Sequence, residues 1–159
     1  MAILSTTRVA ANTIADHLAD HVEIALQHNM IDAAAQAIVA TSETSTSTTY
    51  TDLATAGPAV TVTIGATGRA LVIVSAQLSN VTATGFAGMG YAGSGANTIA
   101  AADTKALVVY SSGAGQYVAA SAAYVETGLT AGSTTFTAKY RQGGGTVTAV
   151  NRRIFILPF

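Results

Sequence analysis

The chain has 159 residues, of which only 9% are charged, and its formal net charge is −1. This length fits a single domain with a small appendage, while the near-neutral charge argues against a dedicated nucleic-acid-binding protein, which is usually strongly basic. The sequence contains no cysteine, which excludes disulfides, thiolate metal sites and a cysteine nucleophile.

The N-terminal sequence gives no sign of a targeting segment. MAILSTTR lacks the basic start and the long apolar run of a signal peptide. No window approaches the roughly 18 apolar residues that a membrane span needs. We therefore expect a protein that is made and kept in a cytoplasm until assembly and that has no membrane partner.

The first predicted element is helical and covers residues 5–40. The Ser/Thr cluster at residues 5–7 suits a helix cap, and Asn29 suits a helix end before an alanine-rich second helix over residues 30–40. The apolar side chains that share one face of the first helix are Ile14, Leu18, Val22 and Leu26. Helices this short are marginal alone, so we expect this stripe to anchor the protein on a partner chain or a symmetry mate.

Three histidines, His17, His21 and His28, lie close together on the same predicted helix. Two histidines four residues apart can bind zinc. However, the first is not followed by the glutamate of the metalloprotease motif, and no third ligand is evident. We expect a polar border to the apolar stripe and no bound metal or cofactor.

Residues 41–49, TSETSTSTT, have nothing apolar to bury and are predicted to be a linker or an exposed extended segment. Charge differs on its two sides: residues 1–47 carry one basic and five acidic side chains, whereas residues 48–159 carry six basic and three acidic ones. The difference in charge is either chance or a sign that the two segments have different functions. We expect an anchor segment over residues 1–40 and a β-domain over residues 50–159.

Short apolar and alternating segments separated by glycine-rich turns follow from Tyr50 onward. The predicted strands cover residues 59–64, 69–78, 82–91, 106–110, 116–127, 133–141, 146–150 and 154–159. Such spacing is typical of an antiparallel β-sandwich, and about eight strands in two sheets suit a jelly roll.

The C-terminal stretch is the most informative. In residues 133–141 aromatic and small side chains alternate with polar ones, and the glycines at residues 143–145 predict a hairpin with residues 146–150. The chain then ends in an apolar run. We expect this run to be buried in a sheet or between subunits of a homotrimer, and its candidate contact residues are Ile154, Phe155, Ile156, Leu157 and Phe159.

The segment from Gly128 through Tyr140 and Arg141, the glycine turn and the closing Asn-Arg-Arg-Ile resemble the C-terminal β-domain of many tailed-bacteriophage virion proteins. In that group a jelly-roll-like domain, similar in outline to tumour-necrosis-factor-type trimers, sits on head decorations, fibres or minor tail proteins. The resemblance covers roughly residues 48–159. It implies a trimeric virion surface protein and carries over no active site.

Catalytic chemistry has little support in the sequence. Residues 88–93 match GxGxxG, but no helix of adequate length follows, so we expect these glycines to let another backbone approach a strand. The predicted β-domain holds no histidine, and its three acids, Asp52, Asp103 and Glu126, select no catalytic pair by their spacing. We expect no enzymatic activity.

A basic group near the C-terminus consists of Lys139, Arg141, Arg152 and Arg153. These side chains are either solvated strand ends or a contact for an acidic partner surface.

Two functions remain open. One is a capsid decoration (minor capsid) protein, a homotrimer whose N-terminal segment binds the major capsid or a tail protein. The other is a tail or fibre-tip receptor-binding module whose loops contact a host surface glycan or protein. The self-contained chain with its own anchor-like helix favours the first.

Overall fold

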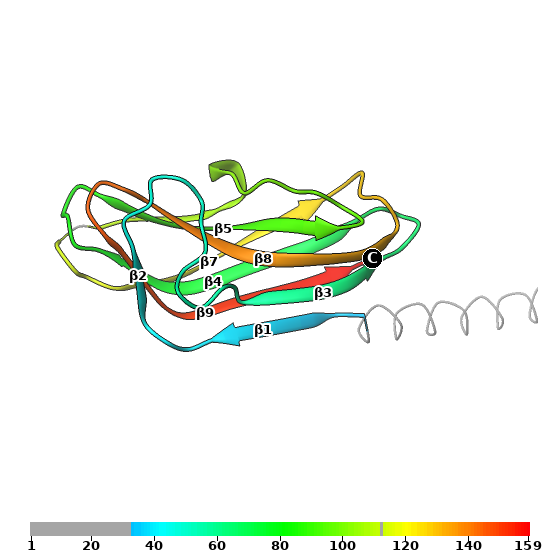
Figure 1. The fold of residues 1–159 in the computed structure, drawn as a ribbon, viewed down its shortest axis with the longest axis horizontal. Helices are drawn as coiled ribbons and strands as arrows, with labels where there is room; N and C mark the ends of the chain where they lie inside the picture. The colour runs from blue at the N-terminus through cyan, green and yellow to red at the C-terminus, as the bar shows by residue number, and fades with distance from the viewer. Residues whose placement is uncertain (1–32, 112) are drawn as a thin grey trace, which may run out of the picture. The chain divides into compact units, whose positions relative to one another are not determined.

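A computed structural model describes residues 33–111 and 113–159 of the chain. These residues form nine antiparallel strands in two facing sheets, which confirms the predicted mainly β architecture (Figure 1). The strands are β1 (Ala35–Val39), β2 (Glu43–Ser45), β3 (Ala59–Ile64), β4 (Ala70–Asn80), β5 (Phe86–Gly95), β6 (Leu107–Tyr110), β7 (Val118–Glu126), β8 (Gly132–Gly143) and β9 (Val147–Pro158). A short 3-10 turn, Asp103–Lys105, precedes β6.

The strands pair in a nested order around the connection between β5 and β6. β5 pairs with β6, β4 with β7, β3 with β8, and β1 with β9. Sheet A has the order β1-β9-β4-β7, with β2 also beside β9, and sheet B has the order β3-β8-β5-β6. The second half of the chain therefore runs back along the first half, and the first and last strands are neighbours.

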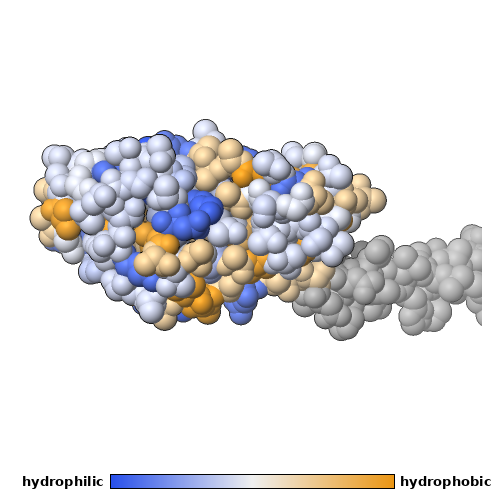
Figure 2. All heavy atoms as spheres, in the orientation of Figure 1, coloured by the Kyte–Doolittle hydropathy of each residue, from blue (hydrophilic) through white to orange (hydrophobic). Residues whose placement is uncertain are grey.

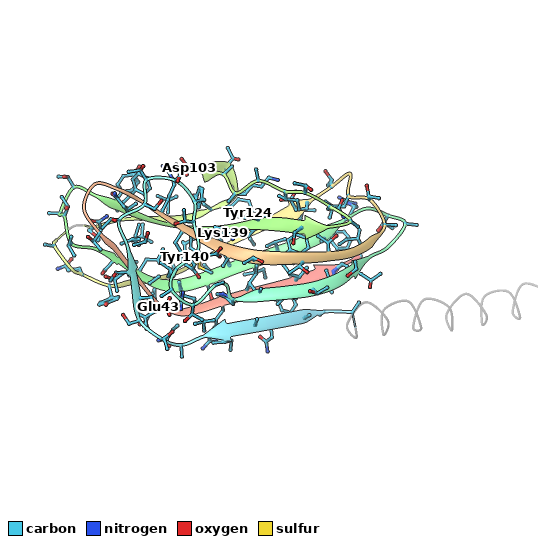
Figure 3. The ribbon with its side chains drawn as sticks, viewed as in Figure 1. Glu43, Asp103, Tyr124, Lys139 and Tyr140 are labelled. Carbon is cyan, nitrogen blue, oxygen red and sulfur yellow. The ribbon has the colours of Figure 1, made fainter. Side chains whose placement is uncertain are left out.

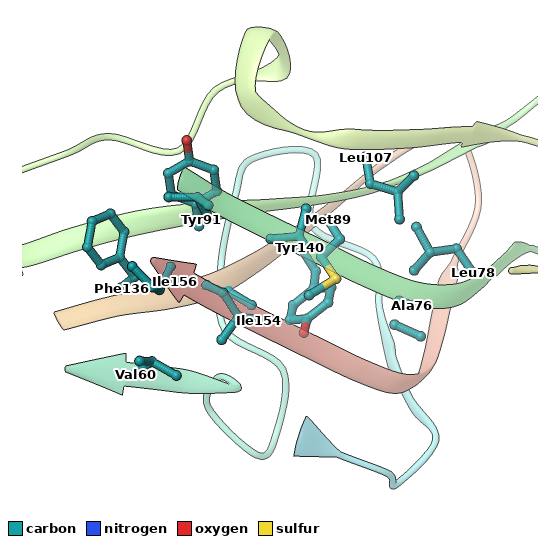
Figure 4. Packing of buried hydrophobic residues seen from close by; sticks show 14 of the residues in the cluster. Val60, Ala76, Leu78, Met89, Tyr91, Leu107, Phe136, Tyr140, Ile154 and Ile156 are labelled. Carbon is teal, nitrogen blue, oxygen red and sulfur yellow. The ribbon is translucent and has the colours of Figure 1, made fainter. Parts of the chain in front are cut away.

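One core fills the space between the sheets. On β8 the side chains of Phe136 and Tyr140 are fully buried, whereas Lys139 lies on the opposite face, as the alternating pattern predicts. Figure 4 shows these rings packed with Ile154 and Ile156 of β9. Burying each such side chain contributes roughly 1.5 to 3 kcal/mol, so the core is the main source of stability.

The prediction of a helix through residue 40 is wrong for Ala35–Val39, which form β1 and pair with β9. Alanine is the best helix former, but helix propensity is a weak preference that tertiary contacts can override, and this strand places Ala35 and Ala37 against the core. Burial and pairing with β9 therefore outweigh the local preference. The rest of the predicted helix, up to residue 32, lies outside the described residues.

Of the two alternatives predicted for residues 41–49, the structure agrees with an exposed extended segment, because these residues are bonded to the sandwich. β2 pairs with the start of β9, and the carbonyl of Ser47 accepts a hydrogen bond from the backbone N–H of Gln142 (2.8 Å). The side chain of Gln142 donates to the carbonyl of Thr46 (3.0 Å). The β-domain therefore includes residues 33–49 as well as the predicted residues 50–159.

The glycines at residues 143–145, the first of which ends β8, do not make a hairpin. Among the described strands β8 pairs with β3 and β5, and β9 lies in the other sheet, so residues 143–145 cross from one sheet to the other. The crossing passes close to the turn before β5: a Cβ at Gly143 would collide with the ring of Phe86, and one at Gly145 with Thr82. The glycines are needed for this close approach, which the sequence alone does not distinguish from a hairpin turn.

The last two predicted strands are one strand with a bulge. Opposite β4, the pairing shifts between Ser75, which faces Arg153, and Gln77, which faces Val150. Asn151 has a positive φ of 52° at this point. A bulge adds one residue and moves the following side chains to the other face. It therefore turns Arg152 into the interior.

Candidate functional site: a hollow on the outer face of sheet B

A hollow of about 530 Å³ lies on the outer face of sheet B and is called here the Tyr50 hollow. β5 and β8 contribute Ala92, Lys139 and Arg141, and the connections before β3 and β6 contribute Tyr50 and Asp103. Figure 3 shows Lys139 on β8 and Asp103 on the 3-10 turn. Segments that are far apart in the sequence therefore meet at this site.

Glycines of β5 make room for the ring of Tyr50. A Cβ at Gly90 would lie 3.0 Å from Cε1 of Tyr50, and a Cβ at Gly88 would lie 3.5 Å from its hydroxyl. At Gly93 the side chain of Ile99 approaches in the same way. The GxGxxG segment thus lies within a strand. The ring of Tyr50 approaches Gly88 and Gly90, whereas Gly93 also exchanges two backbone hydrogen bonds with Ile99 (2.9 and 3.0 Å), as predicted for an approaching backbone.

Arg141 is held between two rings and a carboxylate. Its Nε donates a hydrogen bond to Oδ1 of Asp103 (2.7 Å), and its Nη2 contacts Oδ2 of the same residue. The guanidinium carbon lies 4.6 Å from the ring centroid of Phe86 and 5.5 Å from that of Tyr50. This two-point pairing and stacking fix the planar group in one orientation.

Tyr50 is part of the same network. Its hydroxyl donates to Oδ1 of Asp103 (2.9 Å). Partial burial, followed by the hydrogen bond to the Asp103 carboxylate, raises the pKa of Tyr50 well above its usual range. The phenol therefore stays neutral and acts as a hydrogen-bond donor rather than a base.

Each side-chain carboxylate among the described residues is in an ion pair. The pairs are Glu43 with Arg152, Asp52 with Lys139, Asp103 with Arg141, and Glu126 with Lys105. The Tyr50 hollow is lined by both members of the pair of Asp103 with Arg141, and by Lys139, whose charge is balanced by Asp52 outside the lining, so the site has little net charge. The face shown in Figure 2 is likewise mostly pale, with small hydrophilic and hydrophobic patches. Such a surface suits uncharged polar ligands better than strongly charged ones.

The four residues of the predicted basic group do not gather at one place. Lys139 and Arg141 line the Tyr50 hollow, whereas Arg153 is exposed on the outer face of sheet A beside Ser75. Arg152 is fully buried. Since Lys139, Arg141 and Arg152 each already have an acidic partner, they do not form a basic surface.

Arg152 is the largest fully buried side chain in the described part of the protein. Its Nη1 lies 3.4 Å from Oε2 of Glu43, its Nη2 donates to the hydroxyl of Thr41 (3.2 Å), and its guanidinium lies over the ring of Tyr140. Nε and Nη1 make no hydrogen bond within the described residues. The pair joins the segment around β2 to β9.

The predicted subunit-contact residues divide between two faces of β9. Ile154 and Ile156 are completely buried in the core of the chain itself. Phe155 and Leu157 are partly exposed on the outer face of sheet A, and Phe159 at the end stacks against Arg69 (5.2 Å). On this outer face Phe155 lies opposite Ile73, and Leu157 opposite Leu71, which itself lies opposite Val125. These side chains form one apolar strip.

The predicted anchor residues, Ile14, Leu18, Val22 and Leu26, and the three histidines lie outside the described residues. Within the described part, no group of three or more potential ligands could hold a metal ion, and no helix there has the length and apolar character to cross a membrane.

Sequence reasoning missed Tyr50 and Phe86 as members of this site. Tyr50 is 53 residues from its partner Asp103, which is 38 residues from Arg141, so local spacing holds no signal for their meeting. Glycines 88 and 90 offered the best clue, because two missing side chains on one face of a strand leave room for a ring. No protein-family model matches the chain, and no curated protein matches its sequence.

Proposed function

We propose that this chain is a non-enzymatic structural protein of a tailed-bacteriophage particle, most specifically a trimeric capsid decoration protein anchored by its N-terminal segment. The nested strand order carries this proposal. The strand orders β1-β9-β4-β7 in the five-stranded sheet A, where β2 also pairs with β9, and β3-β8-β5-β6 in the four-stranded sheet B are those expected of a jelly roll, which is a ribbon of paired strands rolled into a sandwich. Viral capsid domains use this fold.

The apolar strip on sheet A supports an assembled protein. Leu71, Ile73 and Phe155 lie side by side there, and Val125 is 51% exposed. A contiguous apolar surface of this kind is typical of a contact between chains. In the proposed trimer, a second and a third copy of the chain cover the apolar strip.

The charge pairing supports binding rather than catalysis. A carboxylate that serves as a general acid or base must be free to exchange a proton with a substrate. Here Asp103 is bound by Arg141 and Tyr50, and Asp52 by Lys139 (2.7 Å). These bonds use the carboxylates to hold neighbouring segments together.

A second candidate function is recognition of a host surface glycan or protein from a tail or fibre tip. The Tyr50 hollow favours it, because an aromatic ring and paired polar groups on a rigid strand floor suit a polar, uncharged ligand. Electron microscopy of intact particles carrying the labelled protein distinguishes the two functions, since decoration places the label on the head and recognition places it on the tail.

The anchoring proposal is tested by adding purified full-length protein to particles that lack it. Leu18→Asp removes an expected anchor side chain. Gln27→Asp adds the same charge at a position that is nine residues from Leu18 and therefore on the opposite side of the predicted helix. We expect Leu18→Asp to bind at least tenfold more weakly than the wild type and Gln27→Asp to bind normally. Equal binding of all three proteins would place the anchor in the sandwich instead.

A further inference from the structure

The free edge of β7 is the longest unpaired strand edge in the described structure. β7 has nine residues and pairs only with β4, in a register without a break, whereas the edge strands β3 and β6 of sheet B have six and four residues. No backbone hydrogen bond between described residues reaches the other side of β7. Its outward N–H and C=O groups can therefore accept another strand.

β7 also lacks the features that usually prevent strands from pairing at an edge. It contains no proline, glycine, lysine or arginine, and no bulge interrupts it. Its one charged residue, Glu126, points inward, where it accepts a hydrogen bond from Tyr91 (2.6 Å) and pairs with Lys105 (2.8 Å). Nothing on this strand repels an approaching one.

The sequence of this edge is close to a palindrome. Residues 117–125 are YVAASAAYV, with Ser121 at the centre. If a second copy pairs antiparallel about a twofold axis through Ser121, alanine meets alanine on both sides of the centre. Tyr117 then faces Val125 of the copy, and Val118 faces Tyr124. Aromatic residues opposite β-branched ones are favourable cross-strand pairs.

Exposure agrees with this register. Tyr117, Val118 and Val125 are 53%, 39% and 51% exposed, which makes them three of the most exposed large apolar side chains among the described residues. Twofold pairing places outward side chains of one copy opposite outward side chains of the other, so Tyr117 and Val125 cover one another. The alanines between them offer no steric obstacle.

We propose that β7 is a self-pairing strand, which joins sheet A of one copy to sheet A of a second copy across a twofold axis at Ser121. The occupant of the edge is a copy of the same chain because the strand is complementary to itself. This pairing goes beyond the proposed function. It joins copies in twos, so trimers built on the apolar strip would associate as hexamers.

A single cysteine tests the register directly, because the chain has no other cysteine. In Ser121→Cys the two sulfur-bearing residues face each other with Cα atoms roughly 4.5 to 5.5 Å apart, which suits a disulfide. In Ala119→Cys the two substituted residues, one on each copy, lie four positions apart along the paired strands, a distance of about 13 Å. Thr63→Cys, at an exposed position of β3, gives the rate of disulfide formation by random collision.

We expect mild oxidation of the full-length protein to convert most of Ser121→Cys into a covalent dimer, at least tenfold faster than either control. Equal rates for the three variants would overturn the proposal.

Ser121→Lys provides an independent test of self-pairing, in which the mass of the oligomer is measured. It places like charges opposite each other at the axis, and because Ser121 is exposed the fold should be retained, as circular dichroism can verify. We expect light scattering to give half the wild-type mass for Ser121→Lys and the wild-type mass for the matched Thr63→Lys. An unchanged mass for Ser121→Lys refutes self-pairing. Particle binding by Leu18→Asp tests the proposed N-terminal anchor and is a separate result.

Discussion

Neutralising Glu43 should destabilise the protein far more than its position in a Ser/Thr-rich segment suggests. Glu43 is the carboxylate that faces the fully buried guanidinium of Arg152 (3.4 Å). In Glu43→Gln the side-chain oxygen can still accept the hydrogen bond from the N–H of Thr55 (2.9 Å), so the change mainly removes the charge. The buried cation of Arg152 is then left without its counter-ion.

Leaving a buried charge without its partner costs about 3 to 5 kcal/mol, and we expect the lower end because the side chain of Glu43 is itself 14% exposed. A loss of about 3 kcal/mol corresponds to a fall in Tm of roughly 6 to 12 °C for a domain of this size. The double variant Glu43→Gln with Arg152→Met removes both charges and should recover part of the loss.

The assay is urea and thermal unfolding followed by circular dichroism at one fixed protein concentration. Asp52→Asn is the matched control, since it removes the carboxylate of the more exposed pair with Lys139 and should cost less than about 1 kcal/mol. If Glu43→Gln is as mild as Asp52→Asn, then the buried pair does not hold the β2 segment and the argument from Arg152 fails.

The same pair predicts a pH dependence. Hydrogen bonds from Thr55, together with the nearby Arg152 guanidinium, lower the pKa of Glu43. A lowered pKa stabilises the folded protein fully above the ordinary glutamate value of about 4.3, and this contribution is lost as the pH falls through the folded-state pKa. From pH 5 downward the wild type should therefore lose more stability than Glu43→Gln.

Two further predictions concern the oligomer and the histidines. Leu157→Asp, on the outer face of sheet A, should dissociate the oligomer while preserving the strand signal in circular dichroism, whereas Ile156→Asp in the core should prevent folding. A Leu157→Asp protein of unchanged mass would rule out the apolar strip as the subunit contact. Elemental analysis of untagged protein should find less than about one transition metal per three chains. Stoichiometric zinc that disappears with His17→Ala and His21→Ala would contradict this.

Sequence reasoning succeeded where structure depends on neighbouring residues. The bounds predicted for β3, residues 59–64, agree with the structure, and β8 shows the predicted alternation of Phe136 and Tyr140 with Lys139. In both strands, a period of two along the chain places apolar side chains on one face. This local rule needs no knowledge of the partner strand.

It failed where a partner far away in the sequence decides the structure. Ala35 and Ala37 are part of a strand because they pair with β9. Residues 143–145 cross between the sheets and pass close to the start of β5. The Tyr50 hollow belongs to the same class. Its acidic and basic side chains come from segments that are far apart in the sequence. The sequence alone does not show which acidic side chain pairs with which basic one.

The nested pairing has a consequence for how the protein folds. β9 is central in sheet A, between β4 and β1, yet it leaves the ribosome after the other eight described strands. β5 and β6 are separated by only residues 96–106 and can pair early, whereas β1 and β9 must close a loop of more than one hundred residues. Contacts of such long range slow folding. Until residue 158 is available, the inner edges of β4 and β1 have no partner, so chains truncated near the C-terminus should aggregate rather than fold.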